Sequence, residues 1–149
     1  MLVLVDTNVL LRVIEPRHAQ HAEAAQSLRA LRRVGHELCL VPQIHYEFWV
    51  VATRAPDQNG LGMTTTEAEA ELLKLGPPLF RLLRDERAIY DRWRELVAKH
   101  DVQGKQAHDS RLVAAMQRHG VTELVTFNVA DFTQYAGINL LEPKAVARA

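Results

Sequence analysis

The sequence has a single cysteine and no excess of charge of either sign. Cys39 has no partner for an intramolecular disulfide, and its place in the apolar run 38–41 favours a buried free thiol in a reducing compartment. The 18 Lys and Arg residues balance 18 Asp and Glu residues, so the chain lacks the large net positive charge of a general nucleic-acid binder. A polyanionic partner would therefore have to be bound through local contacts.

Long hydrophobic segments and leader-like sequence are also lacking. The chain begins with the short apolar run Leu2 to Val5, followed by Asp6, and shows no basic segment, long apolar core or small-residue cleavage site there. No stretch has the length of apolar sequence that a membrane span requires. We therefore expect a cytoplasmic protein that is neither secreted nor inserted in a membrane.

What the sequence does contain is enough apolar material for one compact core. With 149 residues and 48% hydrophobic content, the chain favours a single domain over residues 1–149. Four apolar runs are continuous rather than alternating, as is typical of strands buried on both faces of a parallel sheet: 2–5, 38–41, 124–127 and 138–141. Between them lie segments of helical period, at 8–34, 43–53, 66–75, 86–100 and 108–119. This alternation predicts an α/β sandwich.

Several residues predict where these helices begin and end. Thr66 and Glu69 have the spacing of a capping box, and Asp85 is expected to cap the next helix. Gly35 and Gly120 predict C-terminal helix ends. Residues 80–83 fit either an additional strand or the approach to the following helix, so both alternatives stay open.

Acidic residues follow two of the expected strands. Asp6 comes directly after the first apolar run, and Asp131 lies shortly after the run 124–127, behind Asn128. Because open α/β sheets bind ligands at the carboxyl ends of their strands, both positions favour a site. Each also has a purely structural interpretation, as a helix N-cap for Asp6 and as turn residues for Asn128 and Asp131.

Two further acids lie on the apolar faces of expected helices. Apolar residues at helical spacing are Ile44, Val50 and Val51 around Glu47, and Leu112, Val113 and Met116 after Asp109. An unpaired buried carboxylate is costly, so both acids need a partner. The structural alternatives are that Glu47 extends to water and that Asp109 stabilises the first turn of its helix.

The four acids together predict a cation site. The connections of a parallel sheet can bring two strand ends and two helix positions to one edge, where clustered carboxylates would repel one another. Oxygen ligands favour Mg²⁺ or Mn²⁺, whereas few His and Cys residues have the spacing that zinc requires. Such a site can hydrolyse a phosphodiester through a metal-activated water.

Several short motifs occur in a fixed order along nearly the whole chain. They are Leu4-Val5-Asp6-Thr7-Asn8-Val9-Leu10, Tyr46-Glu47-Phe48, Ala52-Thr53-Arg54 with Asn59-Gly60-Leu61-Gly62, Gly104-Lys105 with His108-Asp109-Ser110-Arg111, and Thr126-Phe127-Asn128 with Asp131-Phe132. In this order and spacing, the chain resembles the PIN-domain ribonucleases, specifically the VapC-type toxins of bacterial toxin–antitoxin systems.

The resemblance implies a three-layer α/β/α sandwich around a mostly parallel central sheet. It also implies an acidic site that binds Mg²⁺ or Mn²⁺ and an endoribonuclease activity on RNA. Relatives of this kind are homodimers that are neutralised by a VapB-like antitoxin, which commonly inserts a peptide segment near the site. The same partners are therefore expected for this chain.

The resemblance also assigns site residues. The first three family acids and the polar residues beside them correspond to Asp6, Glu47 and Asp109 and to Thr7, Asn8 and Thr126. Many relatives have Asp where this chain has Asn128, and the nearest carboxylate here is Asp131. Either of the two could complete the site, because an Asn carbonyl oxygen can also bind a cation or a water.

Two basic residues flank the Asp109 segment. Lys105 and Arg111 are candidate contacts to RNA phosphates, with a solvated surface role as the alternative for each.

Three other functions compete with an antitoxin-controlled ribonuclease. Phosphatases with an Asp nucleophile also start with an apolar run and Asp, but they usually have a second Asp two residues on, where this chain has Asn8. The other two are an RNA-processing PIN nuclease without an antitoxin and an inactive PIN module that only binds RNA or protein. The three intact leading acids argue against the inactive module.

Overall fold

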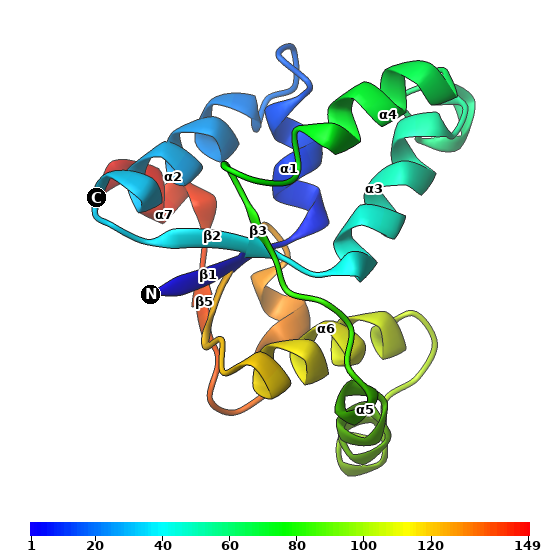
Figure 1. Cartoon of the computed structure of the whole chain (residues 1–149), viewed down its shortest axis with the longest axis vertical. Coiled ribbons are helices and arrows are strands. Elements are labelled where there is room, and N and C mark those ends of the chain that lie inside the picture. Colours follow the sequence, from blue (N-terminus) through cyan, green and yellow to red (C-terminus); the bar gives the residue numbers. More distant parts are fainter.

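The computed structural model describes residues 1–149 as a five-stranded sheet with helices on both faces (Figure 1). The strands are β1 (Leu2–Val5), β2 (Glu37–Leu40), β3 (Arg81–Leu82), β4 (Glu123–Val125) and β5 (Asn139–Leu141). All neighbouring strands are parallel, in the order β3-β2-β1-β4-β5. The expected α/β/α sandwich is confirmed. Of the two alternatives for residues 80–83, the structure has the strand: β3 lies there, at one edge of the sheet.

Seven helices connect and flank the strands. They are α1 (Thr7–Val13), α2 (His21–Arg33), α3 (Pro42–Thr53), α4 (Thr65–Leu73), α5 (Arg87–Lys99), α6 (Gln106–His119) and α7 (Pro143–Arg148). Two 3-10 helices, η1 (Pro56–Gln58) and η2 (Val129–Phe132), lie in the loops after α3 and β4. In Figure 1, α1 to α4 lie on one side of the sheet and α5 and α6 on the other. No helix combines the length and the apolar character that crossing a membrane would require.

The core is formed by the strands and the inner faces of these helices. Val3, Leu4 and Val5 of β1 are almost completely buried, as their continuous apolar run predicts. The same holds for the last three residues of β2 (38–40) and the last two of β4 (124–125). Cys39 of β2 is buried and free, which confirms the prediction of an unpaired structural thiol.

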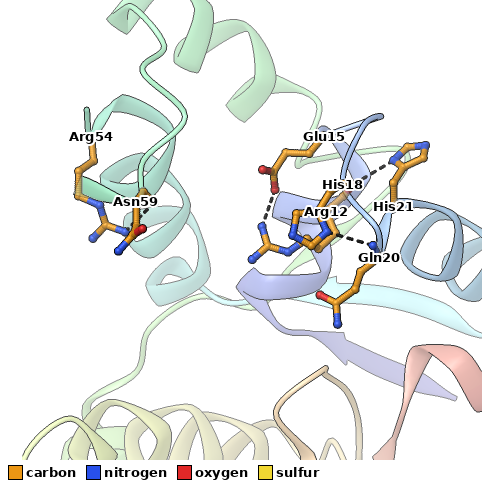
Figure 2. A network of polar contacts seen from close by, with 7 residues as sticks. All are labelled: Arg12, Glu15, His18, Gln20, His21, Arg54 and Asn59. Carbon is orange, nitrogen blue, oxygen red and sulfur yellow. Dashed lines mark hydrogen bonds and ion pairs between the residues drawn. The ribbon is translucent and has the colours of Figure 1, made fainter. Parts of the chain in front are cut away.

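The segment of helical period at 8–34 forms two helices, α1 and α2, rather than one continuous helix. Pro16 lies in the turn between α1 and α2, where it supplies no N–H for a continuing helix. Side chains fix this turn (Figure 2): Arg12 pairs with Glu15, and His21 Nδ1 donates to the Arg12 carbonyl oxygen at 3.0 Å. Apolar residues at helical spacing occur in both helices, so this pattern alone did not reveal the break, whereas Pro16 could have indicated it.

The capping box lies two residues earlier than predicted. Glu67 N donates to Thr64 Oγ1 at 3.1 Å and Thr64 N donates to Glu67 Oε1 at 3.0 Å, so the predicted pair Thr66 and Glu69 is wrong. Both pairs have the spacing of a capping box. Ala68, in the first turn of α4, is fully buried.

The predicted cap at Asp85 is also wrong. Helix α5 has Glu86 at its N-cap position and no side-chain cap. Asp85 instead forms an ion pair with Arg111, with 3.0 Å between Asp85 Oδ1 and Arg111 Nη2. The helix end at Gly120 is confirmed, since this residue is left-handed with φ of 70°. Gly35, with φ of 94°, likewise follows the end of α2.

The chain order creates a switch point at the centre of the sheet. From β1 the chain extends to β2 and β3 on one side, and it then returns to place β4 and β5 on the other. Connections leave the adjacent ends of β1 and β4 in opposite directions, and open α/β sheets bind ligands in the crevice formed there. Asp6 lies at this point, and its backbone N–H donates to the Val125 carbonyl oxygen at 3.0 Å.

Candidate functional site

A cleft of about 660 Å³ lies at the carboxyl ends of the central strands. Its walls come from the start of α1, the outer part of α3 and the first turns of α6. Its polar and charged lining residues include Asp6, Thr7, Asn8, Gln43, Glu47, His108, Asp109, Arg111 and Asn128. The structure therefore brings three of the four predicted acids into one cleft, although they are far apart in the sequence.

Asp6 occupies the junction between β1 and α1. Its backbone is extended, and its Oδ1 accepts a 2.7 Å hydrogen bond from Thr7 N, so it acts as the N-cap of α1. Oδ2 accepts hydrogen bonds from Thr126 Oγ1 at 2.8 Å and from Asn8 Nδ2 at 3.4 Å. Both sequence interpretations hold together: the carboxylate caps the helix and also lines the cleft.

Asn8 and Thr126 join the end of β1 to the end of β4. The Asn8 amide donates to Thr126 Oγ1 at 3.2 Å, and its Oδ1 accepts from Phe127 N at 3.1 Å. Thr126 is completely buried, and its Oγ1 also accepts from Asn128 N at 3.0 Å. This network fixes the orientation of Asp6 through residues on two strands.

Glu47 reaches the same cleft from α3. The side chain is half-buried, and its Oε1 accepts a 2.9 Å hydrogen bond from the Thr7 hydroxyl. Gln43, one helical turn earlier, donates from Nε2 to Oε2 at 3.4 Å. Glu47 is therefore held inside the cleft by two side chains.

Gln43 is a site residue that the sequence analysis missed. It is buried, and its Nε2 donates to the His108 carbonyl oxygen at 2.8 Å. Its Oε1 accepts a hydrogen bond from Arg111 Nη1 at 3.3 Å. Gln43 thus links α3 to the start of α6. Its position four residues before Glu47, on the same helix face, is the one sequence feature that could have indicated it.

Asp109 projects into the cleft from the first turn of α6. It is half-buried, and burial raises the pKa of its carboxyl group to about 7 from the usual 3.8, with further increases from the charges of Asp6, Asp131 and Glu47. No hydrogen bond lowers its pKa in compensation. This carboxylate is therefore the least satisfied acid of the site when it is ionised.

The pKa of Asp6 is also raised, to about 6. Burial is the main cause, hydrogen bonds from Thr126 and Thr7 lower the pKa, and the charges of Glu47 and Asp131 raise it again. The carboxylates are therefore close enough to repel one another, so a positive charge among them would stabilise their ionised forms.

Of the remaining predicted residues, some line the cleft and others lie outside it. Asn128 and Asp131 are both exposed; Asn128 lines the cleft, whereas Asp131 lies on η2 outside it and acts on Asp6 and Asp109 through its charge. Arg111 lines the cleft and pairs with Asp85, while Lys105 is exposed and does not line it.

The oxygen ligands of the cleft meet part of what a divalent cation needs. The structure has no group of three or more His, Cys, Asp or Glu side chains placed to hold a metal ion. Its carboxylate and amide oxygens nevertheless match the chemistry that Mg²⁺ prefers, and the unsatisfied Asp109 carboxylate faces the cleft. Mg²⁺ commonly binds through one or two carboxylates and keeps several waters, so these residues fit it without a complete protein shell.

Comparison with known proteins supports this description of the fold. A sequence model of the PIN domain matches residues 3–138. No curated protein sequence matches the chain.

Solved structures of similar fold cover nearly the whole chain. VapBC2 from Rickettsia felis, bound to a DNA fragment from its promoter, has a TM-score of 0.69 at 13% identity and covers 95% of this chain and 98% of its own. FitAcB from Neisseria gonorrhoeae has a TM-score of 0.65 at 21% identity, with 95% and 97% covered. VapC20 from Mycobacterium tuberculosis, a toxin that cleaves the sarcin-ricin loop, has a TM-score of 0.60 at 17% identity, with 82% and 86% covered. At these identities the similarity establishes a shared fold.

Proposed function

The chain belongs to the PIN-domain family, and from that premise we propose that it is a divalent-metal-dependent endoribonuclease. One observation carries the proposal: Asp6, Glu47 and Asp109, from three separate elements, line a single cleft at the switch point of the sheet. Burial and mutual repulsion raise the pKa of Asp6 and Asp109, which supports a cation as the missing partner.

The chain's own residues would bind and orient the reactants. Asp6 and Asp109 are the proposed direct ligands of Mg²⁺ or Mn²⁺, with Glu47 close by to accept a proton or to hold a water. A bound cation would activate a water for attack on the phosphorus and stabilise the charge on the leaving oxygen. Thr7 and Thr126 hold the carboxylates of Glu47 and Asp6 in place through the hydrogen bonds described above.

Positive charge at the cleft is available for the RNA backbone. Arg111 lines the cleft and carries guanidinium hydrogens beyond those it donates to Gln43 and Asp85. It is the proposed phosphate contact. Lys105 lies outside the cleft and would contact only RNA that extends beyond it.

The fourth site residue is assigned to Asn128 in preference to Asp131. Both residues are exposed, but Asn128 lines the cleft and offers an uncharged oxygen, whereas Asp131 does not line it. In this proposal Asp131 contributes negative potential that attracts the cation, and Asn128 holds a water or a phosphate oxygen.

The nuclease is further proposed to be the toxin of a VapBC-type pair, neutralised by a VapB-like antitoxin. The similar solved structures include toxin–antitoxin complexes, such as one from Klebsiella pneumoniae and VapBC-1 from nontypeable Haemophilus influenzae. Tyr46 and Val50 line the same cleft while remaining 62% and 54% exposed, and they offer apolar contacts to an antitoxin segment. The homodimer implied by the resemblance stays a prediction that analytical ultracentrifugation would test.

Cleavage of end-labelled single-stranded RNA tests the proposed activity. Cleavage is expected with Mg²⁺ or Mn²⁺ and none with EDTA, and Asp6→Asn or Asp109→Asn should slow it by about a hundredfold or more. Asp57→Asn is the matched control, because Asp57 is exposed on η1 and does not line the cleft. Full activity in EDTA, or in either site variant, would refute the metal-dependent mechanism.

The competing functions give different results. Trapping of a phosphoenzyme with a fluorophosphate analogue would indicate an aspartyl-phosphate enzyme. RNA binding without cleavage under any metal condition would indicate an inactive module. If RNA is cleaved, growth arrest on expression and relief by the product of a short neighbouring gene would separate a toxin from an RNA-processing nuclease.

A further inference from the structure

A second cavity, of about 510 Å³, adjoins the cleft between α5 and α6. These two helices pack against each other at one end of the molecule, away from α2 and α7 (Figure 1). His108 and Arg111 of α6 line both the cleft and this cavity. A chain-like ligand that occupies the cleft can therefore continue into the cavity past these two residues.

One wall of the cavity is formed by two aromatic side chains of α5. The rings of Tyr90 and Trp93 have centroids 6.1 Å apart and are inclined by 32°. Trp93 Nε1 donates to the Ala107 carbonyl oxygen at 2.8 Å, which fixes the indole to the start of α6 and satisfies its only polar atom. Tyr90 is 57% exposed. Tyr90 and Trp93 therefore offer aromatic surface to a ligand in the cavity.

Basic side chains surround the two rings. Arg87 lines the cavity and takes part in none of the ion pairs of the structure. Arg94 lies 6.0 Å from the Tyr90 ring centroid and donates to the Tyr90 hydroxyl at 3.3 Å. The one acid in the lining, Glu86, is paired with Arg118 at 2.6 Å. The unpaired charge at the cavity is therefore positive.

We propose that this cavity is a nucleobase subsite, in which an unpaired base of single-stranded RNA stacks on Tyr90 and Trp93. This inference rests on the proposed ribonuclease function, because it places the adjoining phosphodiester in the cleft of Asp6 and Asp109. Aromatic rings flanked by basic side chains suit an unstacked base and its phosphates. A duplex would keep its bases stacked inside, so the preferred substrate is single-stranded or looped RNA.

A fluorescence titration can measure base binding without cleavage. The sequence has two tryptophans, so Trp49→Phe leaves Trp93 as the only reporter, and Asp6→Asn prevents turnover. A short oligoribonucleotide is compared with versions that carry one abasic residue at each position in turn, which keep the phosphates but cannot stack. We expect the intact oligonucleotide to quench Trp93 and one abasic position to weaken binding about tenfold.

Substitutions of Tyr90 then locate the effect. Tyr90→Ala should remove most of the difference between the intact and the abasic oligonucleotide, because the ring is lost. Tyr90→Phe is the matched control: it keeps the ring, loses only the hydroxyl that accepts from Arg94, and should retain the difference. Because Tyr90 is largely exposed, neither change should prevent folding, which circular dichroism would verify.

The outcomes separate this subsite from the nuclease proposal. If the protein cleaves RNA but binds intact and abasic oligonucleotides equally, the subsite is wrong and the nuclease function stands. If base-dependent quenching needs the Tyr90 ring but no metal supports cleavage, base binding stands and the nuclease function fails. If Tyr90→Ala converts a dimer to a monomer without changing the abasic effect, this face is an interface between two copies and the subsite is refuted.

Discussion

The hydroxyl of Thr7 donates a 2.9 Å hydrogen bond to Glu47 Oε1, which joins the first turn of α1 to the middle of α3. The backbone N–H of the same residue donates to Asp6 Oδ1 at 2.7 Å. Thr7 therefore contacts two of the proposed catalytic acids while it is itself buried. Thr7 links Asp6 and Glu47 directly, while Thr126 and Gln43 each hold one of them separately.

Replacing Thr7 with Val should separate the two functions of the residue. The variant keeps the backbone hydrogen bond to Asp6 and the side-chain shape but leaves Glu47 without its hydroxyl partner. We expect kcat for RNA cleavage to fall by about 10–100-fold, as for other residues that orient ligands, with little change in KM. Thr7→Ser restores the hydroxyl and should recover most of the activity. Equal activity of the Val and Ser variants would show that this bond does not position Glu47.

Gln43 is expected to matter for both stability and activity. Gln43→Met has a similar shape but cannot bond to the His108 carbonyl oxygen, Arg111 or Glu47. Leaving these groups without a partner should lower the free energy of unfolding by about 1–3 kcal/mol, as measured by urea denaturation. Cleavage should also slow, because Arg111 and Glu47 lose a fixed neighbour. Gln26→Met on the exposed face of α2 serves as control, and an equal loss in both variants would contradict this role.

The choice between Asn128 and Asp131 can be tested by exchanging their charge. Asn128→Asp places a carboxylate in the cleft lining and should tighten Mn²⁺ binding several-fold, because charge density in oxygen sites sets affinity. Asp131→Asn removes only an exposed charge and should weaken binding by less than about threefold. Isothermal titration with Mn²⁺ measures both. A large loss on Asp131→Asn, with no gain on Asn128→Asp, would reassign the fourth position to Asp131.

Most of the fold could be predicted from the sequence because its strands are fully buried. Continuous apolar runs identify β1, β2, β4 and β5 to within a residue or two, and the α/β alternation follows from them. The two-residue strand β3 carries too little pattern to decide between the two alternatives for residues 80–83, and the short helix α7 was not predicted at all. The break at Pro16 was missed because the expectation rested on apolar spacing, whereas the proline, which has no backbone N–H, was the signal that could have indicated it.

The candidate site was predictable only where local sequence shows an unusual acid. Asp6 follows a strand, and Glu47 and Asp109 lie among apolar helix positions, so each could be selected from its neighbours. Gln43 is uncharged and has only its position one helical turn before Glu47 to indicate it, and its shortest hydrogen bond goes to the His108 carbonyl oxygen, 65 residues away. Contacts of that kind depend on how α3 and α6 pack, which no local pattern encodes.

The raised pKa values predict how stability depends on pH. The carboxyl groups of Asp6 and Asp109 have pKa values of about 6 and about 7 in the folded protein, against the usual 3.8. Between about pH 4 and pH 7 the folded state therefore binds more protons than the unfolded state. The free energy of unfolding should fall as pH rises through this range and stay low above it. Thermal unfolding in EDTA at a series of pH values tests this.

A divalent cation should reverse that loss, because it binds the ionised carboxylates of the folded state only. Adding Mg²⁺ or Mn²⁺ should therefore raise Tm at pH 7.5 and have little effect at pH 5, where Asp109 is protonated. Asp109→Asn removes the repelled charge, so in EDTA at pH 7.5 it should raise Tm by about 2–4 °C while it abolishes cleavage. Asp57→Asn should change neither property, since Asp57 is exposed outside the cleft. A Tm that is independent of pH and of both cations would mean that these acids neither repel one another nor bind metal, and the proposed site would then have no basis.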